Sequence, residues 1–214
     1  MGQDTQLQEL PVFDATNMVN AIYLKGGRHA SESVAKIVDR KAAEKPFTYW
    51  GHNSSENIET TAAKIMQIAS NGKPVYVLIN MKERKDPAEE NDTVMERYRT
   101  PDGNIVEIDT NSVHVQGSSK AIVMTDFHEI DLHNFDLHDY VAFLKGRTND
   151  AAESFKGSLS MGVIQRKPDV KQRDTGSNRV VDKNGGAQVR YLLGIATPPY
   201  VVASVANEDA DEQQ

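Results

Sequence analysis

Residues 53–81, NSSENIETTAAKIMQIASNGKPVYVLINM, contain the clearest helix signal and the clearest strand signal of the chain. Apolar side chains recur at helical spacing over residues 54–70, which predicts an amphipathic helix there. Asn53 and Glu56 resemble a capping box, and Asn71–Gly72 is a typical helix end. Residues 75–81 are apolar on both faces, which favours a central strand. The apolar face of the helix is expected to consist of Ile58, Ala62, Ile65, Met66 and Ala69.

The rest of the chain predicts one more long helix and many strands. Helical periodicity is present over residues 30–43, and short helices are predicted over 137–145 and 150–155. Strand patterns occupy residues 95–99 and 104–108, which form a hairpin around Pro101 and Gly103, and also 113–116, 121–126, 159–165, 189–196 and 200–206. Helices come early and strands late, without regular βαβ alternation. We therefore expect an α+β fold, a largely antiparallel sheet with the two N-terminal-half helices packed on it.

Length and composition favour a single domain. The chain has 214 residues, 38% of them hydrophobic, and we expect one α+β domain over residues 1–206 followed by a disordered acidic tail over 207–214. The absence of cysteine excludes a disulfide framework and cysteine-based zinc sites. The first ten residues, MGQDTQLQEL, predict no signal peptide, and no apolar run approaches the roughly 20 residues that span a bilayer. A cytoplasmic protein without membrane contact is expected.

Charge is distributed unevenly along the chain. Residues 166–190 contain seven cations and three carboxylates, a charge of +4 (7 minus 3), whereas the whole chain carries −7. Residues 207–214 contain four carboxylates and no cation. Such a separation favours a polyanionic partner, because the potential is concentrated on one patch. Within the basic window, residues 167–187 form a polar segment between two predicted strands, and we interpret it as a mobile binding arm rather than an insertion without a role.

Several cations are also close to aromatic residues, a combination that binds single-stranded nucleic acid through phosphates and stacked bases. Trp50 and Tyr98 also fit a core position, since Tyr98 alternates with Arg97 and Arg99 along a strand. The predicted nucleic-acid-binding residues are Lys171, Arg173, Arg179 and Lys183 in the arm, Arg97, Arg99 and Arg190 along the sheet, the stacking residues Tyr98, Tyr191 and Trp50, and Lys25 and Arg28 beside a glycine pair.

The sequence offers little support for an enzyme. The segment 126–140 contains His128, His133 and His138, but a spacing of five residues places successive side chains on different faces of a helix or strand. It also misses the H-E-x-x-H zinc motif by one residue. Neither a phosphate-binding loop nor a G-x-S-x-G motif occurs. We predict a non-enzymatic protein without a metal or cofactor, and keep a metal-dependent hydrolase using these histidines as an alternative.

The β-rich body, the basic arm and the terminal sequence NEDADEQQ (207–214) resemble phage-type single-stranded DNA-binding proteins with acidic C-terminal tails. The chain is also similar in size and acidity to the podoviral ssDNA-binding RNA polymerase cofactors of the Drc family. This resemblance implies coating of ssDNA and recruitment of a polymerase or another replication or transcription protein in the host cytoplasm. The tail lacks the terminal aromatic residue of the usual phage pattern.

The leading hypothesis is therefore a sequence-tolerant ssDNA-binding protein, with homo-oligomerisation as a further expectation. A structural or assembly protein, such as a virion or scaffold component, is the other alternative, because it would have the same β-rich body and extended ends.

Overall fold

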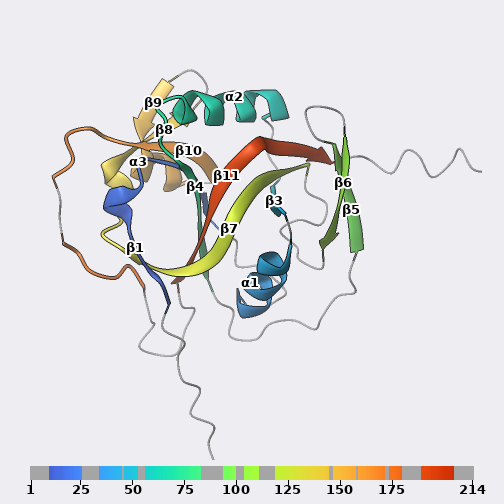
Figure 1. Ribbon diagram of the computed structural model, residues 1–214. Coiled ribbons are helices and arrows are strands. Elements are labelled where there is room, and N and C mark those ends of the chain that lie inside the picture. The colour runs from blue at the N-terminus through green and yellow to red at the C-terminus, as the bar shows by residue number, and fades with distance from the viewer. Residues whose placement is uncertain are drawn as a thin grey trace, which may run out of the picture.

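The computed structural model describes residues 10–25, 34–44, 46–52, 56–82, 94–99, 104–110, 119–144, 147–157, 159–171, 174–179 and 189–204. Within these ranges the protein is mainly a curled, 11-stranded mixed sheet with three α-helices (Figure 1). The main path of the sheet is β1-β7-β11-β4-β2-β10-β8-β9, with β3 paired to β7 and the β5–β6 hairpin paired to β11.

The strands are β1 (Val12–Asp14), β2 (Asn20–Lys25), β3 (Thr48–His52), β4 (Val75–Lys82), β5 (Val94–Arg99), β6 (Ile105–Thr110), β7 (Lys120–His133), β8 (Tyr140–Leu144), β9 (Arg147–Asp150), β10 (Met161–Arg166) and β11 (Val189–Ser204). The helices are α1 (Val34–Ala43), α2 (Ile58–Ala69) and α3 (Ala151–Phe155), with short 3-10 turns η1 (Ala15–Asn17) and η2 (Leu137–Asp139).

The expectation of an α+β fold agrees with this architecture, but the sheet is mixed rather than largely antiparallel. The β1–β7 and β2–β4 pairs are parallel, and the other pairs are antiparallel within the described ranges. Between β2 and β4 the chain passes through α1, β3 and α2. A parallel neighbour needs a long crossover of this kind, whereas an antiparallel neighbour can follow a tight turn.

The two longest strands, β7 and β11, bend together. Asp126 in β7 and Tyr200 in β11 have positive φ values of 54° and 67°, and the register of the pair shifts between Ala196 and Val201. Two prolines within this shift, Pro198 and Pro199, have no N–H to donate to a ladder, so the regular pairing is interrupted there. A bulge of this kind bends a strand and increases its twist.

The bend curls the sheet until β3 approaches the start of β10. His52 Nε2, at the end of β3, lies 3.1 Å from Ser160 Oγ, which immediately precedes β10. Burial, with a smaller contribution from the nearby Lys120 ammonium, lowers the pKa of His52 to about 4. The imidazole at this contact is therefore neutral at neutral pH.

Hydrophobic side chains are buried on both faces of the sheet. One face packs under α1 and α2 and includes Ile22, Val77 and Trp50. The other face packs under η1 and α3 and includes Tyr23, Leu193 and, from β8, Tyr140. Burial on both faces explains why β4 is apolar on both sides, as the sequence predicted.

The helix predicted over residues 54–70 is present but starts later. Asn57, rather than Asn53, is the N-cap, and its side chain accepts from Thr60 N at 2.8 Å. Ile65 and Ile68 are buried, whereas Met66 is 59% exposed, so its predicted place on the apolar face is wrong.

The predicted helix over 137–145 is also wrong, because only η2 is helical and the chain then forms strand β8. Within β8, Tyr140 and Ala142 are buried, the two-residue period of a strand. The strands predicted at 189–196 and 200–206 are one bent strand, β11, and the strand predicted at 121–126 is the first half of the longer strand β7. Strands β1, β2, β3 and β9 were missed. The predicted strand at 113–116 lies outside the described residues. The β5–β6 hairpin, β10 and the short helix α3 are confirmed.

Adding a methyl group at Gly162 should destabilise the protein. A Cβ built there would lie 2.8 Å from Phe155 Cζ, and the Phe155 ring is wedged edge-on against Tyr23. Gly162→Ala should lower the free energy of unfolding by about 1–3 kcal/mol, a typical result of overpacking. Gly157→Ala is the matched control, because a Cβ added there would meet nothing within 4 Å. Urea denaturation that gives the two variants equal stability would contradict this packing.

Candidate nucleic-acid interface

Part of the predicted basic arm is anchored to the body of the protein. Residues 174–179 run beside the end of β7, where Thr175 N donates to Asn134 Oδ1 at 2.9 Å and Ser177 Oγ donates to Asp131 Oδ1 at 2.5 Å. Asn178 forms two further bonds with the main chain of Phe135, at 2.9 and 2.8 Å. In these residues the segment is held in place and does not have the mobility expected of the arm.

Two arm cations can be located. Lys171 is exposed, and Arg179 is half-buried at the end of the anchored stretch. The other arm cations, Arg173 and Lys183, lie outside the described residues, as does Arg28.

Arg190 is neutralised by a carboxylate. Its Nε lies 2.7 Å from Glu129 Oε1 and its NH2 lies 2.5 Å from Glu129 Oε2, with side-chain exposures of only 17% and 10%. Both side chains belong to the paired strands β7 and β11. The expectation that Arg190 binds phosphate is therefore corrected, because its guanidinium is engaged in a bidentate, largely buried ion pair.

The three aromatic residues predicted to stack on bases are buried. Trp50, Tyr98 and Tyr191 are 2%, 0% and 7% exposed. Trp50 packs 6.2 Å from the Phe127 ring, and Tyr191 packs 6.3 Å from the Phe135 ring. Burial raises the pKa of Tyr191 to about 12. Their predicted stacking role is corrected, because a base cannot reach rings that form the hydrophobic cores.

Arg97 and Arg99 are exposed on one face of β5 while Tyr98 faces the core, as the alternation predicted. They lie far from the basic segment, by which we mean the described residues within 166–179 of the basic window. This is because β5 pairs with the end of β11 that lies beside Lys120. The basic segment contacts the other end of β7, at His133. These ends are thirteen residues apart, about 40 Å along the strand. Figure 1 shows the basic segment and the β5–β6 hairpin on opposite sides of the molecule.

Lys25 also lies apart from the basic segment. Its Nζ donates to the carbonyl oxygens of Phe155 and Gly157 at 2.8 and 3.1 Å, where it secures the end of α3. The predicted cations therefore do not form one continuous track over the described surface.

A basic cavity of about 560 Å³ opens where the basic segment leaves β10. Its lining contains two cations, two neutral polar side chains and three apolar side chains, and no carboxylate from the described part of the chain. The lining residues of the basic cavity are Thr16, Asn17, Val19, Arg166, Lys167, Pro168 and Val170. Arg166 and Lys167 belong to the basic window but were not among the predicted binding residues.

Arg166 is held in a fixed position at the end of β10. Its main-chain N–H donates to Val19 O at 2.7 Å, and its NH1 donates to Ala15 O at 3.1 Å. The Tyr140 hydroxyl donates to the same Ala15 oxygen at 3.1 Å, and burial strongly raises the pKa of that tyrosine. The nearby carboxylate of Asp14 accepts from Thr16 N, which is the main reason that the pKa of Asp14 is lowered.

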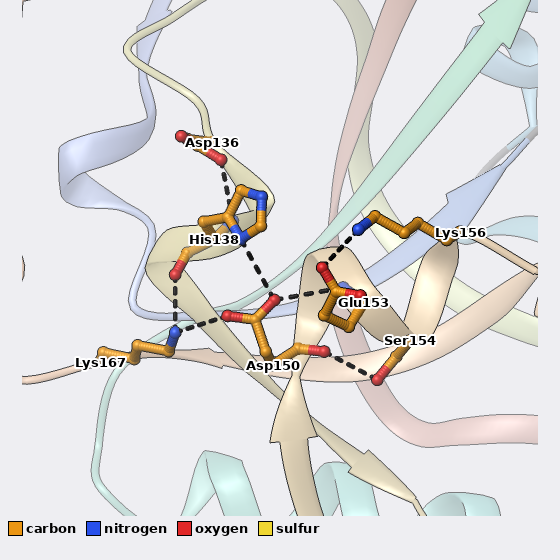
Figure 2. Close-up of polar contacts among 7 residues, drawn as sticks. All are labelled: Asp136, His138, Asp150, Glu153, Ser154, Lys156 and Lys167. Carbon is orange, nitrogen blue, oxygen red and sulfur yellow. Dashed lines mark hydrogen bonds and ion pairs between the residues drawn. The ribbon is translucent and has the colours of Figure 1, made fainter.

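Lys167 is held by a polar network centred on Asp150, which Figure 2 shows. Its Nζ donates to Asp150 Oδ2 at 2.8 Å and to His138 O at 2.7 Å. The other oxygen of Asp150 accepts from Glu153 N at 3.2 Å and lies 3.4 Å from His138 Nδ1. The hydrogen bond from Lys167 is the main reason that the pKa of Asp150 is lowered. Asp150 therefore both caps α3 and balances the charge of Lys167.

The three histidines considered as metal ligands have separate partners. His128 Nδ1 lies 2.7 Å from Asp126 O, His133 lies 3.0 Å from Asp131, and His138 belongs to the Asp150 network. In the ranges that the structure covers, no three His, Cys, Asp or Glu residues are grouped so that they could hold a metal ion. A metal-dependent hydrolase would need these three histidines to lie together, and in the described ranges they do not.

Comparisons with protein families, with known proteins and with solved structures find no match for this chain. No helix in the described ranges is long and apolar enough to cross a membrane. The interpretation of the basic cavity therefore depends on its geometry and charge.

Two substitutions at Asp150 should separate its two roles. Asp150→Asn retains a good N-cap and removes the charge, so unfolding free energy at neutral pH should fall by less than about 1 kcal/mol, as for other partly exposed pairs. Asp150→Ala should lose about 1 kcal/mol more, because α3 also loses its cap. Urea unfolding of both variants measures the difference, and equal losses would contradict the capping role.

The charge effect of Asp150→Asn should also depend on pH. Folding lowers the pKa of Asp150 from 3.8, so the pair stabilises the fold above that value and the contribution is lost as the pH falls through the lower folded value. The stability difference between wild type and Asp150→Asn should therefore shrink in acid. A difference that stays constant down to the most acidic condition at which the protein folds would contradict the ion pair.

Proposed function

We propose that the protein is a non-enzymatic, sequence-tolerant ssDNA-binding protein that holds backbone phosphates on a basic face formed by Arg166, Lys171 and Arg179, with Lys167 adding a charge that Asp150 partly balances. The observation that supports this most directly is the basic cavity, whose described lining contains two cations and no carboxylate in a chain of net charge −7.

The basic face is locally cationic despite the acidity of the whole protein. Residues 166–179 contain five cations and two carboxylates, a charge of +3 (5 minus 2), from which the Asp150 carboxylate beside Lys167 subtracts one. Lys171 is exposed a few residues beyond the basic cavity, and the chain returns at Arg179 beside the end of β7. A local patch of this kind attracts a polyanion even when the protein as a whole is negative.

The burial of Trp50, Tyr98 and Tyr191 defines the expected mode of binding. Stacking on these rings is not part of the proposal, so the phosphate contacts supply the affinity and little sequence preference is expected. A single strand can bend into a concave site, whereas duplex DNA is stiff over about 150 base pairs. The basic cavity therefore favours a single strand. The resemblance to phage-type ssDNA-binding proteins extends the proposal to polymerase recruitment, self-association and a cytoplasmic location.

A pair of matched double variants tests the basic face. Lys171→Gln/Arg179→Gln should weaken ssDNA binding and reduce the slope of log K against log salt by up to about 1.4, since each neutralised phosphate contributes about 0.7 on single strands. Arg97→Gln/Arg99→Gln removes the same charge at the opposite end of β7 and should leave both quantities nearly unchanged. Filter-binding titrations with ssDNA, dsDNA and RNA over a range of salt concentrations measure both.

Equal losses in the two double variants would remove the basic face from the proposal. Absence of ssDNA binding by the wild-type protein at low salt, together with large stable assemblies in light scattering, would contradict DNA binding and favour a structural or assembly role.

A further inference from the structure

The size and the walls of the basic cavity suit a ligand larger than an isolated phosphate ion. Its volume of about 560 Å³ is comparable to the range of about 300–1,000 Å³ that is typical of small-molecule sites, and it is widely open to solvent. One wall carries Arg166 and Lys167, and Thr16 and Asn17 provide a neutral polar wall. The apolar side chains complete the lining, so charged, polar and apolar contacts are all available within one nucleotide-sized space.

Arg166 is the better placed of the two cations to bind a phosphate. Its NH1 donates to the neutral carbonyl of Ala15, and the Asp14 carboxylate is near enough to interact with its charge, but a guanidinium has five N–H donors in a planar fork. That fork matches two phosphate oxygens at once. Lys167 already donates to the Asp150 carboxylate, so it contributes a partly balanced charge. Because both side chains are fixed by hydrogen bonds, little ordering is required when a ligand binds.

The lining residues next to Arg166 offer groups that can contact a sugar and a base. Thr16 is fixed in η1 by its main-chain bond to Asp14 at 2.8 Å, and the neighbouring Asn17 side chain is exposed. A hydroxyl and an amide can donate and accept hydrogen bonds, as sugar hydroxyls and base edges require. Val19 and Val170 provide apolar contact surface beside them.

We propose that the basic cavity binds one nucleotide unit, with its phosphate on Arg166 and its sugar and base against the wall formed by Thr16 and Asn17. This inference rests on the proposed function, because the unit belongs to a bound single strand. The same phosphate–sugar chemistry is present in a free nucleotide, which provides a direct probe.

Calorimetric titration of the full-length protein with thymidine 5′-monophosphate, thymidine and inorganic phosphate tests the site. The nucleotide should bind at least about tenfold more tightly than either fragment, because only the nucleotide combines the charged contact with the sugar and base contacts. Arg166→Lys keeps the charge but removes the fork, and it should weaken nucleotide binding about tenfold. Asn17→Ala should weaken it several-fold without disturbing the core, because Asn17 is exposed.

Lys156→Gln is the matched control. Lys156 is an exposed cation that pairs with Glu153 outside the basic cavity, and its loss should not change nucleotide affinity. Thermal unfolding of each variant establishes that it is folded. Nucleotide binding that is unchanged in both Arg166→Lys and Asn17→Ala overturns the assignment.

Competition with oligothymidylate distinguishes this inference from the proposed function. Displacement of the bound nucleotide by oligothymidylate supports a site on the path of the strand. Binding of oligothymidylate without any binding of the nucleotide overturns the cavity assignment and leaves the proposed function intact. Nucleotide binding that oligothymidylate does not displace overturns the placement of the strand through the cavity.

Discussion

The pairing of β7 with β11 is the constraint on which the rest of the structure depends. These two strands bend together at Asp126 and at the register shift after Ala196, and the bend curls the whole sheet. One end of the pair supports the β5–β6 hairpin, and the other supports β1 and the anchored residues 174–179. Residues that were predicted to form one nucleic-acid-binding surface therefore lie at opposite ends of the β7–β11 pair.

The same pairing determines which charges remain available. It brings Glu129 against Arg190, and strand β9, which pairs with β8 and ends at Asp150, brings that carboxylate against Lys167. Arg166 instead donates to the neutral carbonyl of Ala15, with the Asp14 carboxylate near enough to interact with its charge, and it lines the basic cavity. The distribution of potential thus depends less on how many cations the basic window contains than on which of them fold against a carboxylate.

Local patterns predicted the local structure well. The periodicity of α2, the apolar faces of β4 and the alternation in the paired strands β5 and β6 are properties of neighbouring residues, which a sequence displays directly. Helical spacing was misread at 137–145, because Leu137 and Tyr140 fit a helix as well as a turn followed by strand β8. Contacts between distant residues were not predictable. The bond from Arg166 to Ala15 joins residues 151 positions apart, and the basic cavity exists only once that contact has formed.

The position at which β11 ends determines which cations are within reach of the acidic residues 207–212. Ser204 lies opposite Tyr98 on β5, beside Arg97 and Arg99. This is the end of the β7–β11 pair that is remote from the basic cavity. Glu212 is eight residues after Ser204, and eight fully extended residues span at most about 28 Å. The hairpin arginines are therefore the nearer cations, within one molecule, for the chain that leaves the sheet at Ser204, and the basic cavity is at the other end of the β7–β11 pair.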